Sequence, residues 1–69
     1  MVTPETLTDE MIDQVESHAA KLGDHQTAAD CQLARMKRDR HWTRFKRKRQ
    51  YWARERIAAS INALNGAKP

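Results

Sequence analysis

The residues best suited to chemistry form a basic block at positions 35–56. Eleven of its twenty-two residues are Lys or Arg, and aromatic residues are interleaved with them. Guanidinium and ammonium groups bind phosphates and carboxylates, and aromatic faces stack on nucleobases. The block therefore predicts a polyanionic partner, or a need to neutralise this charge elsewhere on the chain.

On a helix the block divides into two stripes, because residues three or four apart share a face. The first, the cationic stripe, consists of Lys37, Arg40, Arg44, Arg47, Tyr51 and Arg54. The second, the arginine–aromatic stripe, consists of Arg38, Trp42, Phe45, Arg49, Trp52 and Arg56. Lys46 and Lys48 fall on the flanks.

The cationic stripe has the spacing to follow phosphates, and a helix of this kind fits the major groove of B-DNA. The alternative is a solvated surface, but like charges four residues apart repel by about 0.2–0.5 kcal/mol per pair, which an anion would relieve. The predicted nucleic-acid contacts are Lys37, Arg40, Arg44, Arg47, Lys48 and Arg54. Tyr51 is the ring we expect to be exposed and to stack on a base. No reader motif such as a helix-turn-helix indicates sequence specificity.

The arginine–aromatic stripe favours a packing or dimer seam. Large rings usually bury their area, so Trp42, Phe45 and Trp52 are predicted to pack on the first helix or on a second copy. The arginines of the same seam are Arg38, Arg49 and Arg56, and their expected acidic partners are Asp9, Asp13 and Glu16. A further apolar strip comprises Ile57, Ile61 and Leu64. Apolar surface on more than one side of a helix favours self-association, and a homodimer would double the basic surface.

The charge is divided sharply along the chain. Residues 1–34 carry seven acids and one base, a net charge of −6. Residues 35–69 carry twelve bases and two acids, a net charge of +10, so the whole chain has a net charge of +4. Such a division indicates either a basic arm for nucleic acid or two oppositely charged helices that dock on each other.

The elements that must position these residues are helical, since strand signals are absent and helix formers dominate. A first, acidic helix is expected over 9–22, with Thr8 as its N-cap and Gly23 as its stop. Asp24 or Thr27 caps a second, basic helix over 26–64. Length beyond about 25 residues suggests a coiled coil, and the alternative is a break near 39–43 with Thr43 capping a third helix.

Residues 1–69 are therefore expected to form one small all-α domain, a helical hairpin completed by dimerisation, with 1–6 and 65–69 frayed. The run LTDEMI at 7–12 is followed by Ala19-Ala20, Gly23-Asp24, Ala28 or Ala29, Cys31 and Ala34. This segment, 7–34, resembles one that recurs in short uncharacterised proteins of phages and prophages. The resemblance implies an α-hairpin and a phage-type origin, and it carries over no activity and no catalytic residue.

Constellations for catalysis or metal binding are missing from the sequence. His18, His25 and His41 have no metal-type spacing, and the lone Cys31 belongs to no Cys-x-x-Cys pair, so it is predicted to be a small core residue. No Gly-rich phosphate loop is present either. We expect no enzyme, no cofactor and no metal.

Membrane insertion and secretion are also unexpected. No apolar run approaches the roughly 20 residues of a bilayer span, and the start MVTPETLTDE lacks signal-peptide features. With one cysteine, the chain is predicted to act in the cytoplasm, of a host cell if viral. The expected function is non-enzymatic binding of nucleic acid by an accessory or regulatory protein. The alternative is an interaction module or inhibitor that docks on an acidic host protein, and a membrane-surface helix ranks third.

Overall fold

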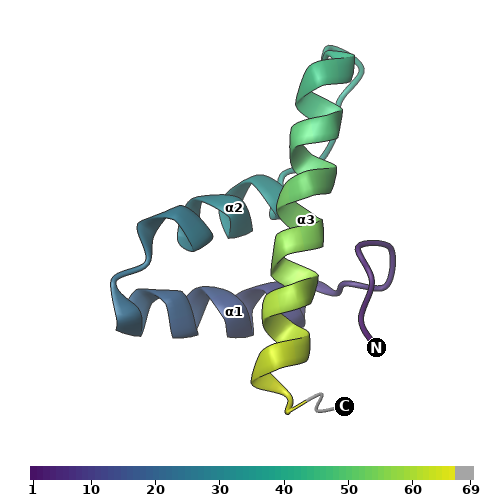
Figure 1. Cartoon of the computed structure of the whole chain (residues 1–69). Coiled ribbons are helices and arrows are strands. Elements are labelled where there is room, and N and C mark those ends of the chain that lie inside the picture. The colour runs from purple at the N-terminus through teal and green to yellow at the C-terminus, as the bar shows by residue number, and fades with distance from the viewer. Residues whose placement is uncertain (67–69) are drawn as a thin grey trace.

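The computed structural model describes residues 1–66, and its regular elements there are three helices (Figure 1). They are α1 (Asp9–Leu22), α2 (His25–Arg35) and α3 (Arg44–Leu64). Helices α1 and α2 run back along each other, and α3 packs across both. The all-helical prediction is confirmed.

Local capping sets the ends of α1 and the start of α2. The hydroxyl oxygen of Thr8 accepts a hydrogen bond from the Met11 amide at 3.2 Å. Gly23 ends α1 in the left-handed conformation, with φ of 70°. Asp24 is the N-cap of α2, and its carboxylate accepts a hydrogen bond from the Thr27 amide at 3.1 Å. The predicted bounds of α1 and these caps are confirmed.

The continuous helix over 26–64 is wrong, and the alternative with a break is confirmed. Helix α2 ends at Arg35, and residues 36–43 connect it to α3, whose N-cap Thr43 accepts from the Lys46 amide at 3.1 Å. The break allows the core to form, because a straight helix over 26–64 would carry Ile57 and Ile61 away from α1. The break folds α3 back so that both side chains become fully buried.

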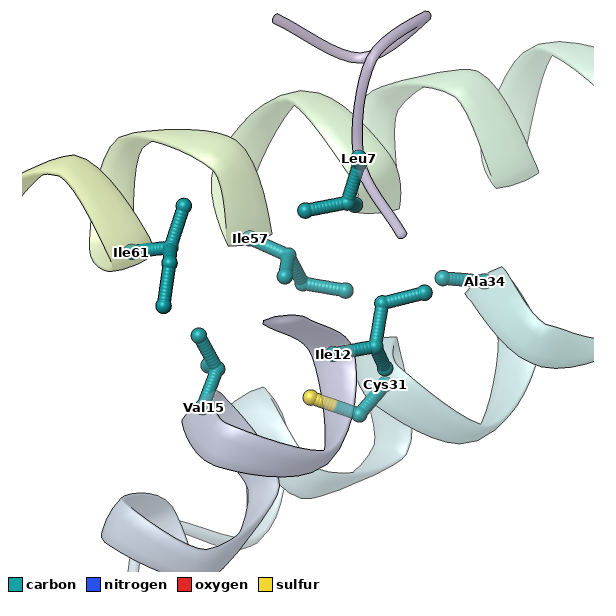
Figure 2. Packing of buried hydrophobic residues seen from close by; sticks show 7 residues of the cluster. All are labelled: Leu7, Ile12, Val15, Cys31, Ala34, Ile57 and Ile61. Carbon is teal, nitrogen blue, oxygen red and sulfur yellow. The ribbon is translucent and has the colours of Figure 1, made fainter. Parts of the chain in front are cut away.

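The core is small and lies where the three helices meet (Figure 2). Its buried members are Leu7, Ile12, Val15, Cys31, Ala34, Ile57 and Ile61. Cys31 is a core residue, as predicted. Leu64, expected in the same strip as Ile57 and Ile61, stays 37% exposed near the end of α3.

The N-terminal segment is held against α3 where fraying was expected for residues 1–6. The Val2 amide donates to the Asn62 side-chain oxygen at 2.9 Å, and the Asn62 amide donates back to the Val2 oxygen at 3.0 Å. At the other end, the Asn65 amide donates to the Ile61 oxygen at 2.9 Å. Residues 67–69 of the predicted frayed end lie outside the described residues.

The first half of α3 extends beyond the α1–α2 pair, and the connection from α2 runs up beside it (Figure 1). We call residues 36–49 the basic arm, and we call α1, α2, the N-terminal segment and the rest of α3 the body. The fold thus separates a packed body from a projecting, charged end of one helix.

Candidate nucleic-acid interface

The basic arm concentrates positive charge at one end of the molecule. Residues 37–49 hold eight bases against one acid, Asp39. The bases are Lys37, Arg38, Arg40, Arg44, Lys46, Arg47, Lys48 and Arg49. Since the loop 36–43 lies beside the first turns of α3, residues from both segments contribute to one charged surface.

Five of the seven predicted nucleic-acid residues lie on this arm and are exposed. They are Lys37, Arg40, Arg44, Arg47 and Lys48. Within residues 1–66 the ion pairs formed by Lys and Arg involve Arg35 and Arg56, so none of these five has an acidic partner. Their charges are therefore available to an external anion.

The start of α3 adds to this positive potential. Its first turn contains no acid, and Arg44, Lys46 and Arg47 stand there instead. The N-terminus of a helix carries a partial positive charge, so each cation there is disfavoured by roughly 0.3–1 kcal/mol. An anion bound at this end would relieve both the dipole and the side-chain repulsion.

Arg54, predicted as a nucleic-acid contact, is instead part of the body. Its guanidinium donates to the main-chain oxygens of Pro4 at 3.1 Å, Ala34 at 3.2 Å and Leu7 at 2.8 Å. The planar fork of an arginine can satisfy several acceptors at once. Arg54 thereby joins the N-terminal segment, α2 and α3, and its charge faces carbonyl oxygens.

Tyr51 also lies beside the N-terminal segment. It is 40% exposed, and its hydroxyl is 3.4 Å from a carboxylate oxygen of Glu5. The negative charge of Glu5 raises the pKa of Tyr51. Tyr51 is exposed as expected, but it is not the most exposed ring of α3.

The predicted burial of the aromatic seam within one chain is wrong for two rings. Phe45 is 65% exposed and Trp52 is 48% exposed. The physical reason is that the side of α3 that packs on the body carries Ala53 and Ile57, and the rings point elsewhere. Trp42 is half-buried, with the Lys46 ammonium 4.5 Å from its ring centroid. Packing on a second copy stays a prediction.

The seam arginines have partners other than those expected. Arg38 donates to the Gln50 side-chain oxygen at 2.6 Å. Arg56 donates to both carboxylate oxygens of Asp30, at 2.8 and 2.9 Å, and this raises the pKa of Arg56. The third seam arginine, Arg49, lines a groove described below.

Two of the acids assigned to these arginines pair instead with Arg35. Its guanidinium lies 2.5 Å from an Asp13 oxygen and 2.6 Å from a Glu16 oxygen, and the Glu16 hydrogen bond is the largest cause of a raised Arg35 pKa. Sequence reasoning missed Arg35 and Asp30 because such pairs depend on how the helices cross. An indication was present, since Arg35 begins the basic block next to the acidic half of the chain.

A groove between α2 and the arm was also not predicted. It is lined by Ala29, Asp30, Leu33, Phe45, Lys46 and Arg49. The acid among these, Asp30, is already paired with Arg56, so the uncompensated charge around the groove is positive. An apolar groove with cations beside it can hold a flat, negatively charged ligand.

Other kinds of site find no support in the described part of the chain. Residues 1–66 contain no group of three or more His, Cys, Asp or Glu placed to hold a metal ion. None of the three described helices is long and apolar enough to cross a membrane. Cys31 is fully buried, and burial raises the pKa of its thiol to about 11, so little of the nucleophilic thiolate exists near pH 7.

The basic arm and its groove thus combine uncompensated charge with the exposed ring of Phe45, and the exposed ring of Trp52 lies on the next turns of α3. No protein-family model, curated protein or solved structure matches this chain.

Proposed function

We propose that this protein binds nucleic acid through the basic arm and catalyses no reaction. The observation that carries the proposal is the crowding of exposed cations around the start of α3, where they lack acidic partners among residues 1–66. The proposed contacts are Lys37, Arg40, Arg44, Arg47 and Lys48. Arg54 is not part of the proposed interface, because its guanidinium already donates hydrogen bonds to main-chain oxygens of the body.

Contacts of this kind are made to phosphates, which position a strand without reading its sequence. Each neutralised phosphate releases counterions, so affinity falls as salt rises. Five contacts give a slope of log K against log salt of about −4.5 on duplex DNA and about −3.5 on a single strand. We therefore expect tight binding at low salt, little sequence preference and a steep loss of affinity towards physiological salt.

The proposed setting is that of an accessory or regulatory protein of phage type, acting in the cytoplasm. A homodimer belongs to the same proposal, because a second copy would double the basic surface and cover apolar side chains that one chain leaves exposed. Sedimentation at several protein concentrations tests this part separately, and a monomer throughout would remove it.

The decisive experiment is a titration of labelled DNA and RNA oligonucleotides, followed by fluorescence anisotropy between about 50 and 200 mM salt. The triple variant Arg40→Ala/Arg44→Ala/Arg47→Ala should abolish binding and leave helicity intact. Lys21→Ala, which removes an exposed cation of α1, is the control and should retain binding. Failure of the unaltered protein to bind either nucleic acid at low salt would end the proposal.

A second candidate is docking on an acidic protein, and the exposure of Phe45 and Trp52 favours it. Large exposed apolar side chains next to cations are also typical of protein interfaces. Nuclease-treated host extract distinguishes the two candidates. Recovery of a stoichiometric protein partner by the unaltered chain, and its loss in a Phe45→Ser/Trp52→Ser variant, would support docking. Recovery that requires intact nucleic acid would exclude it.

A further inference from the structure

We infer that the arm and the adjoining turn of α3 bind a single strand in preference to a duplex, with unpaired bases stacking on Phe45 of the arm and on Trp52 of that turn. One base would enter the groove beside α2, and the neighbouring phosphates would contact Lys46, Lys48 and Arg49. The inference rests on the proposed function, and it assigns to the aromatic rings and the groove a role that phosphate binding alone leaves unexplained.

The first observation is the exposure of the two rings. Phe45 is 65% and Trp52 48% exposed, although the core of this short chain is small. They stand seven residues apart on α3, which is about two turns or 10.5 Å along one face. Exposed apolar side chains that share a face indicate a surface that is covered when a partner binds.

The second observation is the order of rings and cations along that face. Lys48 and Arg49 follow Phe45 by three and four residues and precede Trp52 by four and three. Each cation therefore lies about one helical turn from both rings. Alternating rings and cations match a single strand, whose bases stack on aromatic faces and whose phosphates bind the charges between them.

The third observation is the composition of the groove next to Phe45. Ala29 and Leu33 of α2 contribute apolar surface, and Lys46 and Arg49 contribute charge. The carboxylate of Asp30 accepts two hydrogen bonds from Arg56, so it opposes a phosphate less than a free acid would. The groove therefore offers a flat base an apolar contact beside two cations.

A duplex cannot use this arrangement in the same way. Its bases are stacked on one another, so their faces are closed to Phe45 and Trp52, and the rings would meet only groove edges and the backbone. A single strand exposes those faces. The stacking of each base on a ring is expected to strengthen single-strand binding about tenfold.

The test compares an oligothymidine single strand with a duplex of equal length, at one salt concentration, using the full chain. Phe45→Leu and Trp52→Leu remove the planar rings but keep apolar side chains, whereas Phe45→Tyr keeps the ring. Leu22→Ala, at a 69% exposed position of α1, is the control. Circular dichroism melts verify that each variant is folded.

We expect tighter binding of the single strand than of the duplex. Each Leu variant should weaken single-strand binding about tenfold and leave duplex binding unchanged, with Phe45→Tyr within about twofold of the unaltered protein. In a Trp42→Phe background Trp52 is the sole tryptophan, and its fluorescence should be quenched by a stacked base. This second readout requires no change at either proposed stacking residue.

Four results would overturn the inference. Equal or tighter duplex binding, or single-strand binding that neither Leu variant weakens, would reject it and leave the proposed function standing. Single-strand binding without quenching of Trp52 would do the same. Absence of binding to either form would reject the proposed function as well, and a fall in sedimentation mass of the Leu variants would then assign the rings to contact between two copies.

Discussion

The side-chain amide nitrogen of Gln50 lies 2.8 Å from the main-chain oxygen of Met36. The same nitrogen lies 3.0 Å from the Leu33 oxygen, and the Gln50 side-chain oxygen accepts from Arg38 at 2.6 Å. Carbonyl groups at the end of a helix have no partner within it. Gln50, only 4% exposed, provides one for the end of α2 and so fixes the point where the arm leaves the body.

Replacement of Gln50 by leucine is therefore expected to destabilise the fold. Leucine keeps the volume approximately but removes the donor to the Met36 oxygen and the acceptor of Arg38. Leaving such groups without partners costs about 1–3 kcal/mol. Urea unfolding followed by circular dichroism measures the change. Gln32→Leu, at an exposed position of α2, is the control and should shift stability by less than about 0.5 kcal/mol. Equal stability of the two variants would contradict this role of Gln50.

Arg47 and Arg54 occupy the same face of α3, seven residues apart. Substitution of Arg54 should lower stability, whereas substitution of Arg47 should weaken nucleic-acid binding. Arg54→Leu removes three hydrogen bonds to main-chain oxygens, so unfolding free energy should fall by about 2 kcal/mol or more. Arg47→Leu should leave stability within about 0.5 kcal/mol but weaken nucleic-acid binding and make its salt slope shallower by about 0.9 on duplex DNA or 0.7 on a single strand.

Arg54→Lys provides the matched control for this pair. Lysine keeps the charge but lacks the planar fork, so only part of the stability should return. Full recovery with lysine would show that charge alone matters at this position. A loss of folding in Arg47→Leu would assign that residue to the body and remove it from the interface.

Gly23 should tolerate asparagine better than alanine. Its φ of 70° lies in the left-handed region, and a Cβ there would meet no atom within 4 Å, so the cost is in the backbone alone. We expect Gly23→Ala to lower the unfolding free energy by about 1–2 kcal/mol and Gly23→Asn to lower it less. Thermal melts of the two variants provide the measurement, and a more stable alanine variant would contradict it.

Cys31 should make stability sensitive to alkaline pH. Burial is the main cause that raises the pKa of its thiol from 9.0 to about 11, and the charge of Glu16 adds to it. Between those values the unfolded chain has lost the proton while the folded chain keeps it. Stability from this group is therefore complete below pH 9 and is lost as pH rises towards 11.

The comparison that isolates this effect uses Cys31→Ala. Other groups titrate in the same range in both proteins, so the difference between their pH slopes reports the thiol. Unfolding free energy should fall more steeply from pH 9 to 11 in the unaltered protein. At neutral pH the thiol should react with a disulfide reagent far faster in urea than in the folded chain. Parallel slopes would contradict the raised pKa.

What the sequence alone determined were features set by neighbouring residues. Thr8, Gly23 and Thr43 mark helix ends through contacts within a few positions, so the bounds of α1 and the possible break could be predicted. The density of charge in residues 35–56 is likewise a property of the sequence. The small side chain of Cys31, on a helix face with Ala34, was sufficient to place it in the core.

Only the tertiary structure decided which charges and rings remain available. Helical spacing places Arg47 and Arg54 on one face, yet only Arg54 meets main-chain oxygens of α2 and the N-terminal segment. The pairing of Arg56 with Asp30 and the exposure of Phe45 follow from the angle at which α3 crosses the body. That angle depends on packing between residues distant in the sequence, which local spacing does not encode.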